Sequence, residues 1–326
     1  MNITRSICVI VLLLFLTLIS FLLSLSYGSV SLSFNDLVQV FFQGSHHSLT
    51  HEIVMQLRLP RTVNAFITGG LLAASGCLLQ TLLRNPLADP YILGVSGGCA
   101  VASLIGLFLG VTGYSLPLLT FAGGIGAMLI VFQLSYQVLH WDRTRLLLTG
   151  VIFGAGANAA MSLILTLSPD VNLRGMLFWL LGDLNGSELS FNAGFILLLS
   201  IMAACAISKD LDRLSYGELK AQSLGVNTRR ITLIIYFLSA LMTATAVSIA
   251  GCIGFIGLMT PHLLRLLNFH RHQALLPGCV LMGGSLMMLA DTFARTVFAP
   301  EQLPVGVVTA LLGVPVFFLL ARGTKP

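Results

Sequence analysis

Long apolar runs alternate along this chain with short polar clusters. Only 29 of the 326 residues are charged (17 Lys and Arg, 12 Asp and Glu), and they fall between apolar stretches of about 20 residues, the length at which a helix crosses the hydrocarbon core of a bilayer. With 56% hydrophobic residues, the chain holds more apolar side chains than a soluble core of this size could bury. The pattern therefore predicts an all-α integral membrane protein.

The basic residues predict how many times the chain crosses the membrane, because cytoplasmic loops carry an excess of Lys and Arg. Six basic clusters separate the apolar runs: Arg5; Arg84; Arg143 with Arg145; the polar stretch 209–230; Arg265 with Arg271; and Arg322 with Lys325. If all six face the cytoplasm, each of the five intervals holds an even number of crossings and has room for two. We therefore expect ten helices with both termini inside. This leaves 13 of the 17 basic residues inside and four outside, namely Arg58, Arg61, Arg174 and Arg295.

The ten expected spans follow from this count. They are 7–27, 63–83, 92–110, 116–139, 146–167, 191–208, 231–250, 253–268, 275–298 and 305–322. The first could instead be a cleaved signal peptide, because Arg5 precedes an apolar run that ends in Ser24, Ser26 and Gly28. Its 19 uncharged, mostly apolar residues from Ile7 to Leu25 exceed a usual signal core, which favours a membrane helix.

Few residues suggest a metal site or an ionisable group with a chemical role. His46, His47 and His51 cluster in the first outer loop, where a solvated loop is the simpler interpretation than a metal site, since no further ligand beyond Glu52 has suitable spacing. Asp291 lies well inside a span and four residues before Arg295, so we expect an ion pair on one helix face rather than a proton relay.

The chain also lacks the phosphate-binding loop GxxxxGK[ST] of nucleotide-driven pumps. Its three lysines are Lys209, Lys220 and Lys325, and none follows a glycine. We therefore expect no ATP hydrolysis by this chain, and any such energy must come from a separate subunit that touches its cytoplasmic face.

The polar stretch 209–230, named here the coupling segment, is the largest on that face. Within it, residues 216–225 predict a short helix with Glu218 in its first turn and Gly225 at its end, and Ala221 and Leu224 three apart on one face. Because an isolated helix of this length is marginal in water, it should dock on something, either a partner or its own bundle.

A series of motifs in register resembles a known family. The motifs are Arg58-Leu59-Pro60-Arg61, Ala74-Ser75-Gly76 with Gln80, Arg84-Asn85-Pro86-Leu87-Ala88-Asp89-Pro90, Leu93-Gly94-Val95-Ser96, the Gly217 to Gly225 set, Gly254-Phe255-Ile256-Gly257-Leu258 with Pro261-His262 and Arg265, Ala290-Asp291 with Ala294-Arg295, and Pro304 with Gly306 and Thr309-Ala310. Over residues 58–320 the chain resembles the FecCD family, the permeases of type II ABC importers for iron-siderophores, haem and cobalamin.

The resemblance implies a single permease domain over residues 1–326, ten helices per protomer and a homodimer around one translocation path. It also implies two ATPase subunits that bind ATP and Mg on the cytoplasmic side, a periplasmic substrate-binding protein on the other, and a place in the bacterial inner membrane. No cofactor on this chain and no nucleic-acid partner are expected.

The resemblance further implies roles for particular residues. Arg58, Arg61 and Arg295 would dock the binding protein; the less favoured alternative is that they are interfacial anchors near helix ends. The ATPase would bind a coupling site made of Gly217, Glu218, Ala221, Leu224 and Gly225. The cytoplasmic gate would include Asp142, Arg143 and Thr144, where some relatives have small hydroxyl residues. The translocation path would be lined by Thr149, Gly150, Gly154 and Asn158, and the two glycines also suit close helix packing.

The substrate stays open among a ferric siderophore, haem and cobalamin, with an iron chelate the commoner choice in the family. Two other classes must be weighed. An ion-coupled secondary transporter would explain the interrupted segment 85–90, but ionisable residues at mid-membrane depth are lacking. An intramembrane enzyme would need a catalytic constellation, and the chain has no HExxH motif and no paired carboxylates within its spans.

Overall fold

A computed structural model of the chain describes residues 3–28, 32–42, 49–135, 143–185 and 189–323. Within these ranges every regular element is a helix, and there is no strand. The elements in chain order are α1 (Ile3–Ser26), α2 (Phe34–Phe42), α3 (Leu49–Glu52), the π-helical turn η1 (Ile53–Arg58), α4 (Leu59–Leu83), the 3-10 turn η2 (Pro90–Leu93), α5 (Val95–Phe108), α6 (Ser115–Ser135), α7 (Arg143–Leu167), α8 (Asp170–Leu180), α9 (Phe191–Ala206), α10 (Ser208–Ser215), α11 (Glu218–Ser223), α12 (Thr228–Ala250), α13 (Ile256–Leu266), α14 (His272–Thr296) and α15 (Val305–Gly323).

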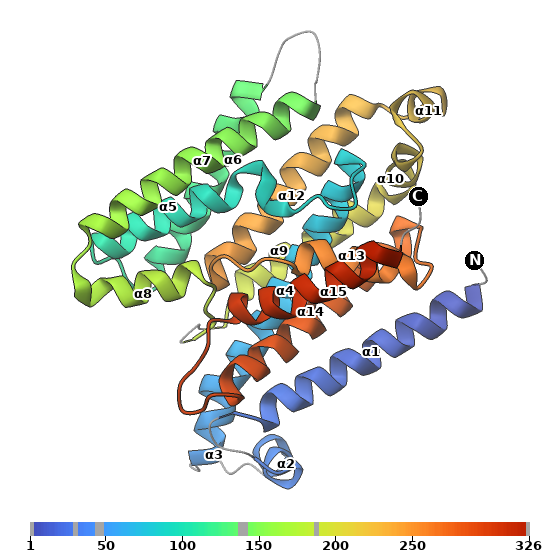
Figure 1. The fold of residues 1–326 in the computed structure, drawn as a ribbon. Coiled ribbons are helices and arrows are strands. Elements are labelled where there is room, and N and C mark those ends of the chain that lie inside the picture. The colour runs from blue at the N-terminus through green and yellow to red at the C-terminus, as the bar shows by residue number, and fades with distance from the viewer. Residues whose placement is uncertain (1–2, 29–31, 43–48, 136–142, 186–188, 324–326) are drawn as a thin grey trace.

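The long helices run roughly along one direction and define two ends of a bundle. Figure 1 shows the N-terminal end of α1 and the C-terminal end of α15 on the same side as α10 and α11. The short helices α2, α3 and α8 lie toward the opposite side. The two ends therefore carry different elements, α10 and α11 at one and α2 and α3 at the other.

Each of the ten expected spans contains a helix. Six helical stretches of the described residues are long and apolar enough to cross a membrane, and α9 with α10 forms a seventh span, bent by 60°, if the pair counts as one. α5 and α15 are shorter apolar helices. The expected span 253–268 is wrong in length, since α13 covers only 11 residues.

α13 is short because the chain is not helical between Ala250 and Ile256. Gly251 ends α12 with φ +68°, and a side chain there would meet the carbonyl oxygen of Trp179 at 2.1 Å, so only glycine fits. The Tyr91 hydroxyl donates to the carbonyl oxygen of Ile253 at 2.9 Å and accepts from its N–H at 2.7 Å. These bonds satisfy backbone groups that helix formation would otherwise pair, as the membrane interior requires.

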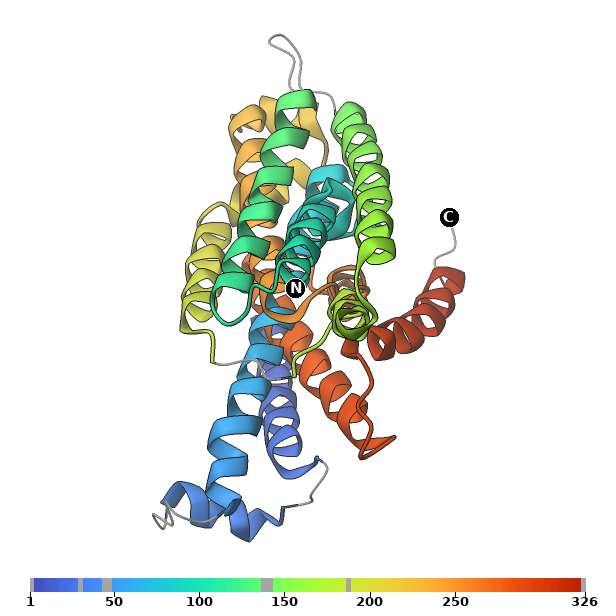
Figure 2. The same ribbon diagram turned by 90° about the vertical axis from the view of Figure 1, so that its left-hand side faces the viewer.

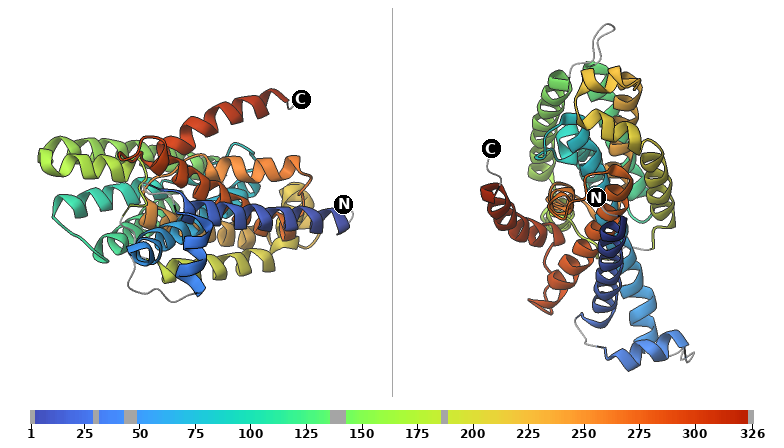
Figure 3. Two further views of the ribbon diagram at one scale, coloured as in Figure 1. Left: turned by 90° about the horizontal axis from the view of Figure 1, so that it is seen from below. Right: turned by 90° about the vertical axis from the view of Figure 1, so that its right-hand side faces the viewer.

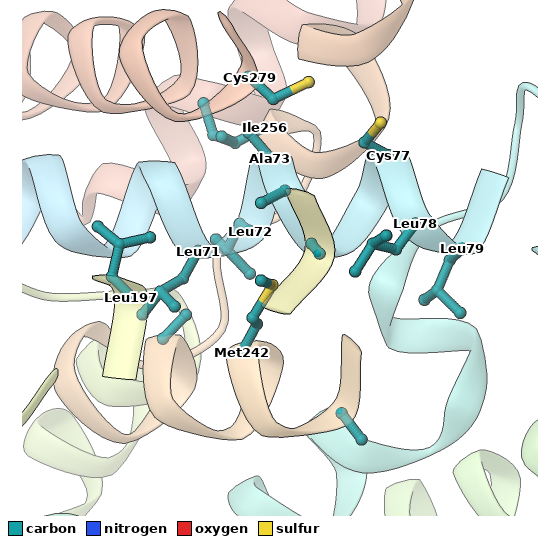
Figure 4. Packing of buried hydrophobic residues seen from close by; sticks show 14 of the residues in the cluster. Leu71, Leu72, Ala73, Cys77, Leu78, Leu79, Leu197, Met242, Ile256 and Cys279 are labelled. Atoms are coloured by element: carbon teal, nitrogen blue, oxygen red, sulfur yellow. The ribbon is translucent and has the colours of Figure 1, made fainter. Parts of the chain in front are cut away.

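α4 is the central helix of the bundle. Its glycines let neighbouring backbones approach: a Cβ on Gly69 would lie 2.2 Å from the carbonyl oxygen of Gly283 in α14, and one on Gly76 would lie 1.9 Å from that of Gly257 in α13. Figure 4 shows the other face of α4, where Leu71 and Leu72 lie beside Leu197 of α9 and Met242 of α12. These α4 leucines are at most 2% exposed.

α7 is much less covered by the rest of the protein than α4 is. Only 11% of the apolar window of α7 is buried, against 89% for the window that contains α4. Figure 2 shows α7 and α9 at opposite edges of the bundle. Figure 3 shows α15 projecting at another edge, where its main neighbours are α13 and α14.

Candidate functional sites at the two ends of the bundle

Three of the four arginines expected to face outward are buried close to one carboxylate, and the group is named here the arginine cluster (Arg58, Arg61, Asp291 and Arg295). The Arg61 Nε donates to the two carboxylate oxygens of Asp291 at 2.9 and 3.2 Å, and its Nη2 lies 2.9 Å from Oδ1. Arg295 places its Nε 3.1 Å from the other oxygen, Oδ2. The predicted ion pair between Asp291 and Arg295 is thus confirmed, and Arg61 is a second partner that spacing could not reveal.

Arg295 and Arg58 also donate to groups outside this cluster. Arg295 Nη2 donates to the carbonyl and hydroxyl oxygens of Ser24 at 3.1 and 3.0 Å. Arg58 Nη1 donates to the carbonyl oxygens of Leu25 and Ser26 at 2.7 and 2.8 Å. The cluster thereby ties the end of α1 to η1 and α14.

These contacts leave little of the arginines accessible. Arg58 is 5% exposed and Arg61 and Arg295 are each 7% exposed, while Asp291 is fully buried. The cluster holds three guanidinium groups and one carboxylate, of which Arg61 and Arg295 contact Asp291, so its net charge is +2. It can act on a partner through its electric field, but its side chains are already bonded inside the protein.

Arg61 Nη1 reaches two further residues that no sequence pattern had indicated. It donates to Gln302 Oε1 at 2.9 Å and to Asn185 Oδ1 at 3.4 Å. Both lie in connecting segments, one after α8 and the other before α15. The cluster therefore also fixes the connections beside it.

In the coupling segment at the opposite end, three large side chains in and around α11 are exposed. Ala221 is buried, whereas Tyr216, Leu219 and Leu224 are 74%, 83% and 56% exposed. The helix is shorter than predicted, Glu218–Ser223, because Leu224 already follows its end. The expectation that Ala221 and Leu224 share a face is wrong for this reason: Ala221 faces the bundle and Leu224 faces outward.

Glycines set both ends of this short helix. Gly217 precedes it with φ +114° and Gly225 follows it with φ +82°, conformations that other residues rarely adopt. No atom lies within 4 Å of a Cβ built on Gly225. That position needs glycine for its backbone conformation and not for lack of space.

The predicted path residues lie on α7 in two different settings. Gly150 is buried, and a Cβ there would lie 2.3 Å from the carbonyl oxygen of Ile92, so this glycine serves close packing on η2. Gly154 has nothing within 4 Å of such an atom, and Asn158 is exposed. The Thr149 hydroxyl is bonded back to the carbonyl oxygen of Arg145 at 2.8 Å.

The predicted gate is only partly described. Asp142 lies outside the described residues, as do His46 and His47. Arg143 is the first residue of α7, and Thr144, in its first turn, is exposed. Within the described ranges, no group of three or more His, Cys, Asp or Glu side chains is placed to hold a metal ion.

The interrupted segment 85–90 is a capped turn. The Asn85 side chain accepts from the N–H of Leu87 at 2.9 Å, and Asp89 accepts from the N–H of Tyr91 at 2.8 Å at the start of η2. Residues 94–98 match the letters GxSxG, but they follow the 3-10 turn η2 and not the strand that a nucleophile elbow requires.

Known proteins share this architecture over almost the whole chain. The sequence profile of the FecCD transport family matches residues 16–323. The chain belongs to the FecCD transport family. It is 38% identical over 319 residues to the hemin transport system permease protein HmuU of Yersinia pestis, covering 94% of this chain and 93% of that protein. It is also 38% identical over 271 residues to the vitamin B12 import system permease protein BtuC of Escherichia coli O157:H7, covering 82% of each.

A solved structure agrees with this membership of the family. The fold matches that of a metal-chelate type ABC transporter in an inward-facing conformation with a TM-score of 0.84, at 33% sequence identity, over 96% of this chain and 98% of that one. This chain is accordingly a permease subunit of an ABC importer, and ATP hydrolysis belongs to separate ATPase subunits.

Proposed function

We propose that this permease carries a bulky metal chelate, a ferric siderophore or haem, from the periplasm to the cytoplasm across the bacterial inner membrane. The observation that carries this proposal is the near full-length similarity to a hemin permease, together with the fold shared with a metal-chelate transporter. Cobalamin is the alternative substrate, favoured by the similarity to a vitamin B12 permease.

Ten crossings with both termini in the cytoplasm complete the proposed topology. The coincidence of ten expected spans with helices supports the count, with α5, α13 and α15 as short crossings and α9 bent toward α10. The chain ends near α10 and α11 support a common side. Positive-inside counting makes that side the cytoplasm.

Homodimer formation would cover the apolar surface of α7. A helix buried over only 11% of its window within one protomer faces either lipid or a second copy. The open position at Gly154 and the exposed Asn158 suit a wide, weakly binding path for a bulky solute, since conduction requires the solute to leave as well as enter. Thr149 and Gly150 would belong to the same wall.

At the periplasmic end, the arginine cluster would attract acidic residues of a binding protein. Its net charge of +2 favours such a partner through electrostatic steering, which sets association rate and orientation more than affinity. Arg58, Arg61 and Arg295 would thus supply a positively charged site held in a fixed position, because each donates hydrogen bonds within the chain.

At the cytoplasmic end, α11 would lie against an ATPase subunit. Tyr216, Leu219 and Leu224 offer an exposed apolar surface at an end that should face water, and such patches mark protein interfaces. Gly217 and Gly225 would shape the turns on either side, with Glu218 at the helix start and Ala221 anchoring the helix to its own bundle.

Closure of the translocation path at the cytoplasmic end would involve Asp142, Arg143 and Thr144.

Substrate identity can be tested with the partner binding protein. We expect a ferric siderophore or haem to displace a bound chelate in competition binding, and the same compound to enter proteoliposomes that contain the complete transporter. Exclusive binding and uptake of cobalamin would establish the alternative. Uptake that follows an ion gradient without ATP would instead favour a secondary transporter.

A further inference from the structure

A hydrogen-bonded chain links the coupling segment to the two central helices of the bundle. It consists of Asp212 in α10, His272 at the start of α14 and Thr81 in the last two turns of α4. Asp212 Oδ1 lies 2.6 Å from the ring Nδ1 of His272 and accepts from its backbone N–H at 2.9 Å. The ring Nε2 lies 2.8 Å from Thr81 Oγ1.

Asp212 is a strong acceptor in this position. Burial raises the pKa of its carboxyl group, but the hydrogen bonds from the His272 ring and backbone outweigh that effect, so the pKa lies below the ordinary value and the group is ionised at neutral pH. An ionised carboxylate only accepts, so Nδ1 of His272 carries a proton. The carboxylate also sits at the N-terminus of α14, where the helix dipole favours negative charge.

The bond between His272 Nε2 and Thr81 Oγ1 can form whether or not Nε2 carries a proton. The Thr81 hydroxyl is within 2.9 Å of the carbonyl oxygen of Cys77, so it can donate there and accept from Nε2, or donate to Nε2 itself. The His272 ring is 4% exposed at its side chain, which shields both bonds from water. The link from α10 to α4 therefore does not depend on the charge of His272.

α10 directly precedes α11 in the chain and packs against the bundle. Leu211 and Leu214 bury its inner face, and only Tyr216 and Gly217 separate it from α11. On the other side, a 60° bend joins it to α9. A shift of α11 against an ATPase can pass through α10, where Asp212 is bonded to His272 of the bundle, and also through α12, because Gln222 Nε2 in α11 donates to Thr228 Oγ1 at 3.1 Å.

α4 and α14 continue this link across the membrane. Their backbones touch at Gly69 and Gly283. At the far end Arg61 of α4 is ion-paired with Asp291 of α14 at 2.9 Å. The same two helices are thus joined by polar bonds at both ends, by the arginine cluster at one and by Thr81 and His272 at the other.

We infer that Asp212, His272 and Thr81 are positioning residues that transmit movement between the ATPase-facing helix α11 and the α4–α14 pair. The effect of a binding protein that docks at the arginine cluster would then be transmitted to the ATPase through Asp212, His272 and Thr81. The inference rests on the proposed docking of partners at the two ends. It deepens that proposal by naming the residues that connect them.

The test is binding-protein stimulation of ATP hydrolysis in the complete transporter, reconstituted from the full-length chain, its ATPase and its binding protein. For Asp212→Ala and His272→Ala we expect normal co-purification of the ATPase and a basal hydrolysis rate within about twofold of wild type, but stimulation reduced about tenfold. The double variant should be no worse than either single one, because both break the same link. Asp212→Asn should keep most of the stimulation, since its amide oxygen can accept both bonds.

Asp210→Ala is the matched control. Asp210 belongs to the same helix and pairs only at the surface with Arg213, at 3.2 Å, so its loss should leave stimulation unchanged. Wild-type stimulation in both alanine variants would overturn the inference. So would a parallel loss of ATPase association, basal rate and stimulation, since that describes a purely structural bond. A wild-type chain that neither binds nor stimulates an ATPase would overturn the proposed function as well, which distinguishes the two failures.

Discussion

The two ends of this bundle place their side chains in opposite ways. At the arginine cluster, charged groups are buried and bonded to one another, with Asp291 fully buried and three arginines at most 7% exposed. At α11, apolar groups are outside, with Leu219 83% exposed. The first arrangement holds helices together and can act on a partner only through electrostatic attraction. The second adds little to the fold and offers a partner a surface.

The contrast predicts that removing a charge at the arginine cluster damages the fold most. Asp291→Ala would leave Arg61 and Arg295 buried without a counter-charge, a change that typically costs about 3–5 kcal/mol. We expect a large fall in the thermal unfolding temperature of the purified chain in detergent. Glu301→Ala is the control, because its pair with Arg174 is 78% exposed on both sides and should contribute almost nothing. Equal stability of the two variants would mean that the cluster does not hold the bundle.

A charge placed on the exposed apolar surface should have the reverse effect. Leu219→Glu should leave the unfolding temperature unchanged, because the side chain contacts little of its own protein, and should weaken co-purification of the ATPase by at least about tenfold if it occupies a well-packed interface position. Leu49→Glu is a matched control, an exposed leucine at the opposite end. Retained ATPase binding by Leu219→Glu would show that this surface meets something else.

Backbone strain offers a smaller and more local test of the same end. Gly225→Val should cost about 1 kcal/mol or more, because a β-branched residue is strained at positive φ, and should weaken ATPase association while the bundle stays folded. Gly225→Asn is the control, since asparagine tolerates this conformation better. Glu218→Lys should also weaken association. Unchanged co-purification and uptake for the valine and lysine variants would mean that α11 docks elsewhere.

The smallest expected effect concerns the field of the arginine cluster. The docking rate of the binding protein on the wild-type chain should fall several-fold between low and high salt, because the screening length is only about 8 Å at physiological ionic strength. Salt dependence is the cleaner measurement here, since reversing Arg61 or Arg295 to Glu would also place two carboxylates together in the interior. A salt-independent rate in stopped-flow measurements would leave the arginines as structural bonds alone.

Short-range patterns in the sequence predicted the spans and the pair formed by Asp291 and Arg295. Apolar length places a helix in each expected span, and a spacing of four places two side chains on one helix face. Residues that meet from distant parts of the chain were not predictable in this way. Arg61 is separated from Asp291 by 230 positions, and Tyr91 from the break it holds at Ile253 by 162.

The orientation of the coupling segment was missed for a different reason. Ala221 and Leu224 share a face only if the helix continues through both, and it ends at Ser223. The position of a helix end depends on the turn imposed by Gly225, and helix boundaries are the least certain part of a sequence prediction. The burial of Arg58 was equally out of reach, because its acceptors are backbone carbonyl groups of Leu25 and Ser26.

The central claim is that this chain is a permease whose transport is driven by a separate ATPase. The most direct measurement is uptake of a chelate held by the partner binding protein into proteoliposomes, with and without the ATPase subunits and ATP. We predict no hydrolysis by the purified chain alone, and uptake only when the ATPase, ATP and binding protein are all present. ATP hydrolysis by the partner-free chain, or uptake without ATP that collapses with an ion gradient, would contradict this account.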